Sequence, residues 1–319
     1  MPKILPSGKL PSYKTPTHFE TMYYNDHTAI YLNGSIVKAA EAKTDFFGQT
    51  LHYGYGVFEG IRSYRTASGE TKIFKELAHF ERLRNSAKAL NMPFTWDLAT
   101  LIEATYEVLR INELQDAYIR PVVYAPANMS FNPNKESFIV IETWQMQPFL
   151  GEKLLKVMTS SFERPNPRGF RIEAKATGHY VNSILASQEA KSKGFDEALL
   201  NDLNGYVAEG PGANIFVERQ GVLYTPKAGN ILPGITRATV MELCREQDIT
   251  FEETQLKTAD LLGADSAFFC GTAAEVIGME SLDTVPFKKK WSDSLGSRIQ
   301  AAYKDLVIEK ALKTTEITT

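Results

Sequence analysis

Short apolar segments with strand-like and helix-like spacing alternate along the chain without a regular β-α-β repeat, and this pattern most limits the folds open to it. Apolar runs such as Phe138–Ile141 favour strands, whereas the spacing of Leu77, Phe80 and Leu83 predicts an amphipathic helix over 76–90. The longest apolar runs are far shorter than a membrane span. The sequence therefore predicts a mixed α/β (α+β) fold.

Turn signals separate the expected elements of the first half. Asn33-Gly34 predicts a hairpin turn after a strand at Ala29–Leu32, and Ala67-Ser68-Gly69 predicts a second hairpin within 61–75. Beyond these, we expect a helix over 97–110 and strands at Ile119–Tyr124 and Phe138–Thr143.

The second half mixes strands and helices in the same way. The expected elements are a strand at 154–159, a helix at 180–193, strands near 197–201, 206–218 and 221–225, a helix after Pro233-Gly234, a strand at Ala267–Cys270 and a helix at about 292–313. A length of 319 residues favours two domains. We expect an N-terminal extension at 1–25, a small domain at 26–148 and a large domain at 149–319.

Charge and cysteine content argue against several classes of protein, namely those that bind nucleic acid, membranes or a metal through an overall charge or a ligand motif. With 35 Lys and Arg against 38 Asp and Glu, the net charge of -3 gives no overall attraction to nucleic acid or to a membrane surface. Cys244 and Cys270 form no CxxC pair, and the five histidines lack ligand spacing, so no metal site is expected. The first residues contain no apolar signal segment, and we expect a cytoplasmic protein.

The common nucleotide and hydrolase motifs are absent. The glycines of Gly54–Gly60 and Gly210–Ile215 do not fit GxGxxG, and no GxxxxGK[ST], GxSxG or HExxH motif occurs.

Two other segments could cradle a phosphate. Leu232–Arg237 opens an amphipathic helix, and Cys270–Glu275 follows an apolar strand. In both, glycine permits close approach of the backbone and threonine adds a hydroxyl, while a helix N-terminus offers free N–H groups to an anion. Ordinary helix capping explains the same residues equally simply.

Lys175 and Glu209 are candidate reactive groups. Lys175 lies among small residues in Glu173–Gly178, which would let a flat ring approach a partly desolvated amine. Glu209 ends a strand before Gly210-Pro211-Gly212 and could face a site. A solvated lysine and a surface acid remain the simpler alternatives, because both residue types are mostly exposed.

Several segments occur in the order seen in fold type IV (class IV) pyridoxal-phosphate enzymes, and the chain resembles that family. The matching segments are Glu173–Tyr180, Glu209–Phe216, Leu232–Arg237 and Gly271–Glu275. The segments His52–Gly54, Val57–Arg62 and Tyr118–Pro121 resemble branched-chain amino-acid aminotransferases in particular. The likeness runs from about residue 29 to about residue 305. It implies a smaller N-terminal α/β domain and a larger C-terminal domain with a β-barrel-like core, with the cofactor between them.

The resemblance assigns pyridoxal phosphate as the cofactor and a set of residues that hold it. Lys175 matches the lysine that binds it covalently, Tyr180 the tyrosine at its phenolic oxygen, and Glu209 the acid at its ring nitrogen. The remaining matches are Arg82, Ile235, Thr236 and Thr272 around the phosphate, Gly212 and Leu232 against the ring, and Gly271 beside them. Lys175 would then also act as general base and acid at the substrate Cα.

The resemblance also places residues on the substrate side. These are Tyr53, Phe58, Arg62, Tyr118 and Arg120, with Thr272 and Ala273 in the turn that receives the substrate α-carboxylate. The loop Asn128–Asn134 matches the region that approaches the neighbouring subunit's pocket. A homodimer or a higher homo-oligomer is therefore expected.

The implied reaction is reversible amino transfer from L-leucine, L-isoleucine or L-valine to 2-oxoglutarate, which gives branched-chain 2-oxo acids and L-glutamate. The alternatives are a D-amino-acid or amine aminotransferase, an aminodeoxychorismate lyase of the same fold, and a noncatalytic protein that retains the fold. Tyr118–Pro121 favours the branched-chain group, and the joint presence of lysine, tyrosine, acid and arginine argues against a noncatalytic protein.

Overall fold

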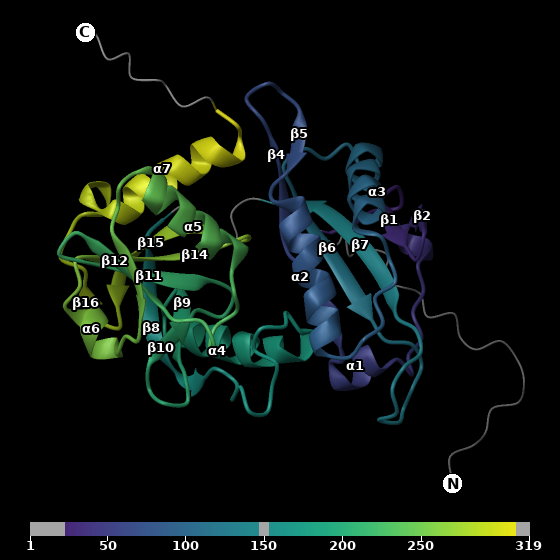
Figure 1. The fold of residues 1–319 in the computed structure, drawn as a ribbon, viewed down its shortest axis with the longest axis horizontal. Coiled ribbons are helices and arrows are strands. Elements are labelled where there is room, and N and C mark those ends of the chain that lie inside the picture. The colour runs from purple at the N-terminus through teal and green to yellow at the C-terminus, as the bar shows by residue number, and fades with distance from the viewer. Residues whose placement is uncertain (1–22, 147–152, 311–319) are drawn as a thin grey trace, which may run out of the picture.

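The structure, a computed structural model, describes residues 23–146 and 153–310. Two units lie side by side, and α4 and α2 approach each other where they meet (Figure 1). Most of the expected N-terminal extension and the expected domain boundary at 148/149 lie outside the described residues.

The first unit is built on an antiparallel sheet. Within the described residues it has seven strands in the order β2-β1-β7-β6-β4-β5, with β3 paired to β6. The strands are β1 (Ala29–Leu32), β2 (Ser35–Lys38), β3 (Gly56–Phe58), β4 (Ile61–Arg65), β5 (Thr71–Ile73), β6 (Ala117–Tyr124) and β7 (Phe138–Gln145), and the helices are α1 (Gln49–Tyr53), α2 (Glu76–Ala89) and α3 (Leu98–Ile111). Burial alternates along β7, as one apolar face of a sheet requires, and α2 and α3 contribute to the same hydrophobic core.

The second unit is a curled mixed sheet covered by helices. Among the described residues it has nine strands in the order β10-β9-β8-β15-β14-β11-β12-β13, with β16 paired to β15. The strands are β8 (Leu155–Glu163), β9 (Glu197–Asn201), β10 (Val207–Glu209), β11 (Asn214–Arg219), β12 (Val222–Pro226), β13 (Phe251–Thr254), β14 (Ser266–Gly271), β15 (Glu275–Leu282) and β16 (Val285–Pro286), and the helices are α4 (Tyr180–Ser192), α5 (Ile235–Glu246), α6 (Thr258–Leu262) and α7 (Leu295–Val307). Because β10 also contacts β11 and β12, the sheet curls back on itself. The curled sheet matches the expected core.

The predicted elements are confirmed with two corrections. The expected strand 206–218 is two strands, β10 and β11, because Gly210-Pro211-Gly212 interrupts it, and proline lacks the N–H that a strand ladder needs. The segment Thr272–Ala274 forms the turn between antiparallel β14 and β15. The last helix is shorter than expected, since α7 begins at Leu295 after a 3-10 turn at Trp291–Asp293.

A backbone junction next to Lys175 joins the two units. Gly54 has a φ of +64°, and a Cβ there would lie 2.7 Å from the Cα of Gly178, so only glycine permits this approach. Gly178 N–H donates to the Gly54 carbonyl at 3.1 Å, and Phe58 N–H donates to the Lys175 carbonyl at 3.0 Å. The segment that carries Lys175 is therefore paired to the edge of the small unit.

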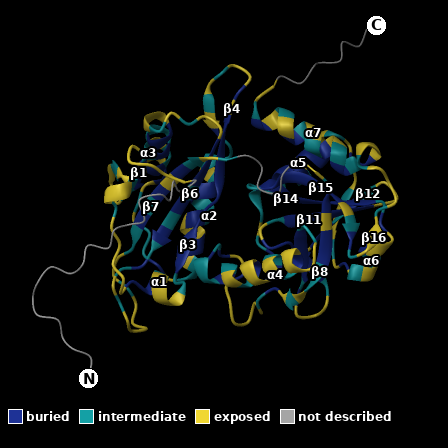
Figure 2. Ribbon diagram, turned by 180° about the vertical axis from the view of Figure 1, so that it is seen from behind, coloured by how far each residue is buried: buried dark blue, intermediate teal, exposed yellow. Residues whose placement is uncertain are grey.

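Burial follows the two sheets. Strands are mostly buried, whereas α4 carries a long exposed face (Figure 2). None of the helices in the described ranges is long and apolar enough to cross a membrane.

Candidate active site

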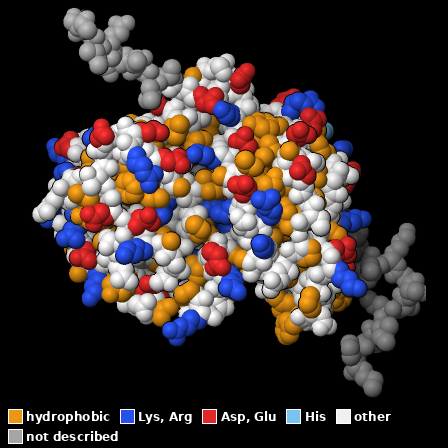
Figure 3. Space-filling view, viewed as in Figure 1, with side chains coloured by type: hydrophobic (Ala, Val, Ile, Leu, Met, Phe, Trp, Pro, Cys, Tyr) orange, Lys and Arg blue, Asp and Glu red, His pale blue; other side chains and the backbone are white. Residues whose placement is uncertain are grey.

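A cavity of about 1290 Å³ lies between the two units and takes its lining from both. Lys and Arg side chains gather near the middle of the face in Figure 3, where the units meet. Most residues that the sequence singled out line this cavity: Arg82, Lys175, Tyr180, Glu209, Gly212, Leu232, Ile235, Thr236, Gly271, Thr272 and Ala273, with Phe58, Tyr118 and Arg120. Residues from distant parts of the chain are thus brought together by the fold.

Lys175 points its amine at Tyr180. Its Nζ donates a hydrogen bond to the Tyr180 hydroxyl oxygen at 2.7 Å and lies 5.0 Å from the centre of the Phe58 ring. The 3-10 turn Thr177–His179 produces this approach, because it places Tyr180 at the first turn of α4. On the other side, Ser86 of α2 accepts from the Lys175 N–H at 3.0 Å. Lys175 is therefore held by both units.

Glu209 is a buried carboxylate with several donors. It is 4% exposed, and it accepts from Asn214 Nδ2 at 2.9 Å and from the Leu232 N–H at 3.1 Å. Arg164 forms an ion pair with it at 2.9 Å. Burial raises the pKa of Glu209 above its ordinary value, while Arg164 and the Leu232 N–H oppose the rise. Its surroundings thus hold a fixed acid in the lining of the cavity.

Arg82 lines the cavity from α2 of the first unit. Its Nε and Nη2 donate to the two oxygens of Glu59 at 2.7 and 2.8 Å. Its Nη1 donates to the Pro233 carbonyl at 3.0 Å, next to the N-terminus of α5. The cation is thus fixed beside a helix N-terminus.

The N-terminus of α5 and the β14–β15 turn supply the neutral donors. Gly234, Ile235 and Thr236 line the cavity at the start of α5, where backbone N–H groups have no partner within the helix. Thr272 and Ala273 line it from the turn. Together with Arg82 these groups suit an anion.

The remaining wall is aromatic around Arg120. The guanidinium carbon of Arg120 lies 4.5 Å from the centre of the Phe58 ring and 5.2 Å from that of Tyr118. Its Nη2 donates to the Tyr118 hydroxyl at 3.1 Å, whereas its Nε is buried without a partner. The wall thus offers apolar surface and one cation in the same place.

Two residues expected on the substrate side lie outside this cavity. Tyr53 is 47% exposed on the surface, and its ring lies 5.6 Å from that of Phe131. Arg62 is buried and donates to Glu275 at 2.8 Å across the two units. Nothing local in the sequence predicts the Arg62 pair, because its partner lies 213 residues further along the chain.

Other residues at the cavity are not among the site residues that the sequence assigns. Trp144, which the sequence suggests only as a pocket wall and not as a substrate-binding residue, lines the cavity, and its ring lies 5.0 Å from that of Tyr118. Gly60 also lines it, and a Cβ at this position would lie 2.0 Å from the Tyr118 hydroxyl, so a larger residue would displace Tyr118. Arg164 belongs to no motif that sequence reasoning singled out. Glu59 and Gly60 do lie in Val57–Arg62, so that motif was the available signal.

Comparisons with known proteins agree with this geometry. The sequence model of the family described as amino-transferase class IV matches residues 56–282. The chain is 40% identical over 287 residues to the branched-chain-amino-acid aminotransferase of Pseudomonas aeruginosa. The aligned residues cover 88% of this chain and 93% of that relative.

Solved structures give the same result. The branched-chain aminotransferase of Thermoproteus uzoniensis with norvaline has a TM-score of 0.86 at 34% identity, covering 90% of this chain and 96% of that one. The T.th. branched-chain amino acid aminotransferase complexed with N-(5'-phosphopyridoxyl)-L-glutamate has a TM-score of 0.84 at 36% identity, covering 89% and 95%. The chain therefore belongs to the class IV aminotransferases, among the branched-chain-amino-acid aminotransferases.

Proposed function

We propose that this enzyme transfers the amino group of L-leucine, L-isoleucine or L-valine to 2-oxoglutarate on pyridoxal phosphate, with Lys175 as the catalytic residue. The observation that carries the proposal is the meeting of Lys175, Tyr180, Glu209 and Arg82 around one cavity. The family membership and the named ligands of the solved relatives support it.

The donor set of the cavity fits pyridoxal phosphate. Arg82, the N-terminus of α5 and the β14–β15 turn suit a phosphate, and the paired carboxylate of Glu209 suits a protonated ring nitrogen. Lys175, hydrogen-bonded to Tyr180, suits a carbonyl carbon beside a phenolic oxygen. Gly212 and Leu232 would border the ring.

Lys175 is the group we assign to proton movement. When bound, pyridoxal phosphate carries the amino group between substrates and takes up the electrons released at the substrate Cα. The Nζ of Lys175, freed as an amine, accepts the Cα proton and later donates it. Tyr180 orients this amine through the 2.7 Å hydrogen bond. The N–H groups of Thr272 and Ala273 receive the substrate α-carboxylate and fix Cα beside the amine.

Arg120 lets one pocket accept two unlike side chains. Phe58, Tyr118 and Trp144 supply the apolar contact that leucine needs. Glutamate brings a second carboxylate, which is costly to bury without a partner, and the guanidinium of Arg120 supplies one. With leucine bound, Arg120 keeps the Tyr118 hydroxyl and the faces of its aromatic neighbours.

A second copy of the chain completes the site. Six exposed apolar side chains form one surface over α1 and the loop 128–134, which we call the α1 patch: Phe46, Phe47, Leu51, Tyr53, Met129 and Phe131. Hydrophobic atoms gather over α1 in Figure 3. Patches of this kind mark protein–protein interfaces. Tyr53 lies in the α1 patch and not in the cavity of the same chain. We therefore place it at the cavity of a partner subunit.

We also place the enzyme in the cytoplasm. Cys244 and Cys270 are unpaired and buried, which suits a reducing compartment.

The first prediction concerns the amino donor. With 2-oxoglutarate as acceptor, L-leucine, L-isoleucine and L-valine should give far higher kcat/KM than D-alanine or simple amines. A panel of both enantiomers, assayed for glutamate formation, measures this. Faster turnover of D-alanine, or release of pyruvate from aminodeoxychorismate, would assign the chain to another activity of the same fold.

The second prediction concerns Arg120. Arg120→Met should lower kcat/KM for glutamate and 2-oxoglutarate by roughly 30- to 1000-fold, because a charge-assisted contact of about 2–4 kcal/mol is lost. The leucine half-reaction should change little. Single-turnover kinetics separate the two half-reactions, and Arg110→Met, at an exposed arginine of α3, is the matched control. An equal loss in both half-reactions would mean that Arg120 supports the fold or the cofactor instead.

The third prediction concerns the α1 patch. Phe131→Asp should weaken self-association and reduce activity in parallel, because it introduces a charge into an apolar interface. Leu262→Asp, at an exposed leucine of α6, should leave both unchanged. Analytical ultracentrifugation and activity assays over the same concentration range provide the test. A fully active wild-type monomer would exclude a site completed by a partner.

A further inference from the structure

Glu59 is a fully buried acid for which the proposed function has no role. It lies between β3 and β4, has no exposed surface, and its N–H donates to the Pro121 carbonyl at 2.8 Å. A buried charge costs several kcal/mol unless it is paired and hydrogen-bonded. The groups that bind its carboxylate should therefore show what the acid does at this position.

Both carboxylate oxygens of Glu59 are occupied. Oε1 accepts from Arg82 Nε at 2.7 Å, and Oε2 accepts from Arg82 Nη2 at 2.8 Å and from His79 Nδ1 at 2.7 Å. The Gly60 N–H adds a longer contact of 3.3 Å. The two parallel bonds fix the plane of the Arg82 guanidinium.

The surroundings of Glu59 and His79 determine which of the two is charged. Burial alone would raise the pKa of Glu59, but Arg82 and His79 outweigh burial and hold that pKa well below its ordinary value. Burial lowers the pKa of His79 despite Glu59, which favours a neutral ring at neutral pH. Since a carboxylate only accepts, Nδ1 of His79 carries the proton.

The sequence builds this group from one helix face. His79, Arg82 and Ser86 are three and four residues apart on α2, so they share the face that meets the large unit. Ser86 holds the Lys175 N–H, and Arg82 Nη1 holds the Pro233 carbonyl before α5. The helix face that carries Arg82 is thus tied both to the Lys175 segment and to the start of α5.

We propose that Glu59 and His79 are positioning residues that fix the Arg82 guanidinium in the orientation in which it meets the cofactor phosphate. This inference rests on the proposed placement of that phosphate beside Arg82. The proposal and simple electrostatics predict opposite effects of Glu59→Gln on phosphate binding. Removing the negative charge of Glu59 would by itself favour a phosphate dianion, whereas releasing Arg82 from its fixed orientation weakens phosphate binding.

The test measures the affinity of the full chain, freed of cofactor, for pyridoxal phosphate and for pyridoxal, which lacks the phosphate. Glu59→Gln should weaken pyridoxal phosphate binding by about 10- to 100-fold and leave pyridoxal binding unchanged. Loss of a residue that orients the ligands of a bound metal ion typically lowers affinity by the same range. Absorbance titration gives both constants. Unchanged or tighter binding of pyridoxal phosphate, or an equal loss for both ligands, would overturn the proposal.

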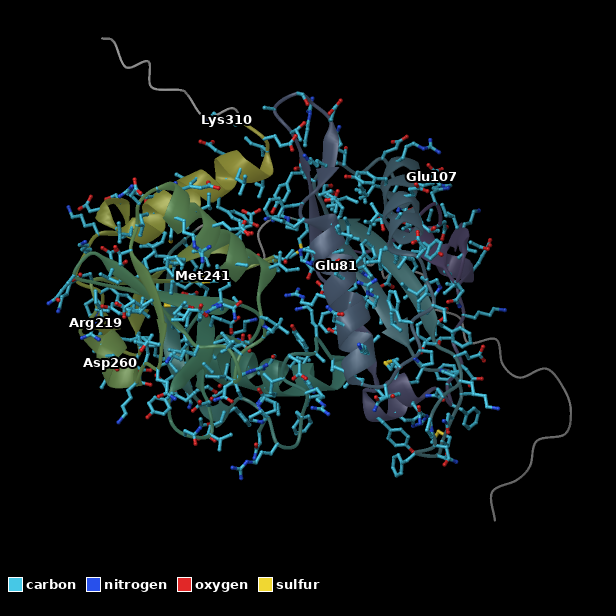
Figure 4. All side chains as sticks on the ribbon, in the orientation of Figure 1. Glu81, Glu107, Arg219, Met241, Asp260 and Lys310 are labelled. Atoms are coloured by element: carbon cyan, nitrogen blue, oxygen red, sulfur yellow. The ribbon has the colours of Figure 1, made fainter. Side chains whose placement is uncertain are left out.

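A double-mutant cycle with Arg82→Gln shows whether Glu59 acts through Arg82. Glu59→Gln should have almost no further effect in the Arg82→Gln background, whereas an additive loss would mean a separate role and overturn the proposal. Glu107→Gln is the matched control, since Glu107 lies on α3 away from the cavity (Figure 4). It should bind pyridoxal phosphate like the wild type.

Two further measurements keep the test decisive. If Glu59→Gln does not fold, Glu59→Asp retains the charge but is too short for the same paired contact, and it should lose affinity for pyridoxal phosphate only. An equal loss for pyridoxal again overturns the proposal. A wild-type chain that binds both ligands equally would instead refute the placement of the phosphate beside Arg82, which belongs to the proposed function.

Discussion

The pairing of the Lys175 segment with the edge of the small unit is the constraint on which the rest of the site depends. Phe58 N–H reaches the Lys175 carbonyl at 3.0 Å, and Gly54 meets Gly178 so closely that neither could carry a side chain without displacement. Because this junction sets how the two units face each other, it also sets where Arg82 and Arg120 of one unit stand relative to Glu209 of the other. The cavity is a consequence of that junction.

Three largely buried arginines of the two units are each paired with a buried acid. Arg82 lies against Glu59, Arg164 against Glu209, and Arg62 against Glu275, with contacts of 2.7 to 2.9 Å. Pairing offsets much of the cost of removing each charge from water, and breaking one pair leaves an expensive buried charge. The same burial excludes water and strengthens each interaction with a bound anion. Stability and function therefore rest on the same groups.

Local patterns predicted much of the site, and long-range packing decided the rest. Lys175 and Tyr180 are five residues apart, so one motif carries both, and most expected strands and helices follow from periodicity. The position of Arg62 depends on Glu275, which no local pattern can indicate. Tyr53 was expected in the pocket but lies in the α1 patch. The sequence near Tyr53 does not show whether the folded chain buries this ring or leaves it on the surface.

The covalent partner of the cofactor tests the account most directly. Borohydride reduction of the holoenzyme, followed by peptide mass spectrometry, should place the pyridoxyl group on Lys175, whose Nζ lies 2.7 Å from the Tyr180 hydroxyl. Lys191 is the informative alternative, because it also lines the cavity. Label on Lys175 alone is the predicted result. Label on Lys191 or on any other lysine, with Lys175 unmodified, would contradict the assignment of the whole site.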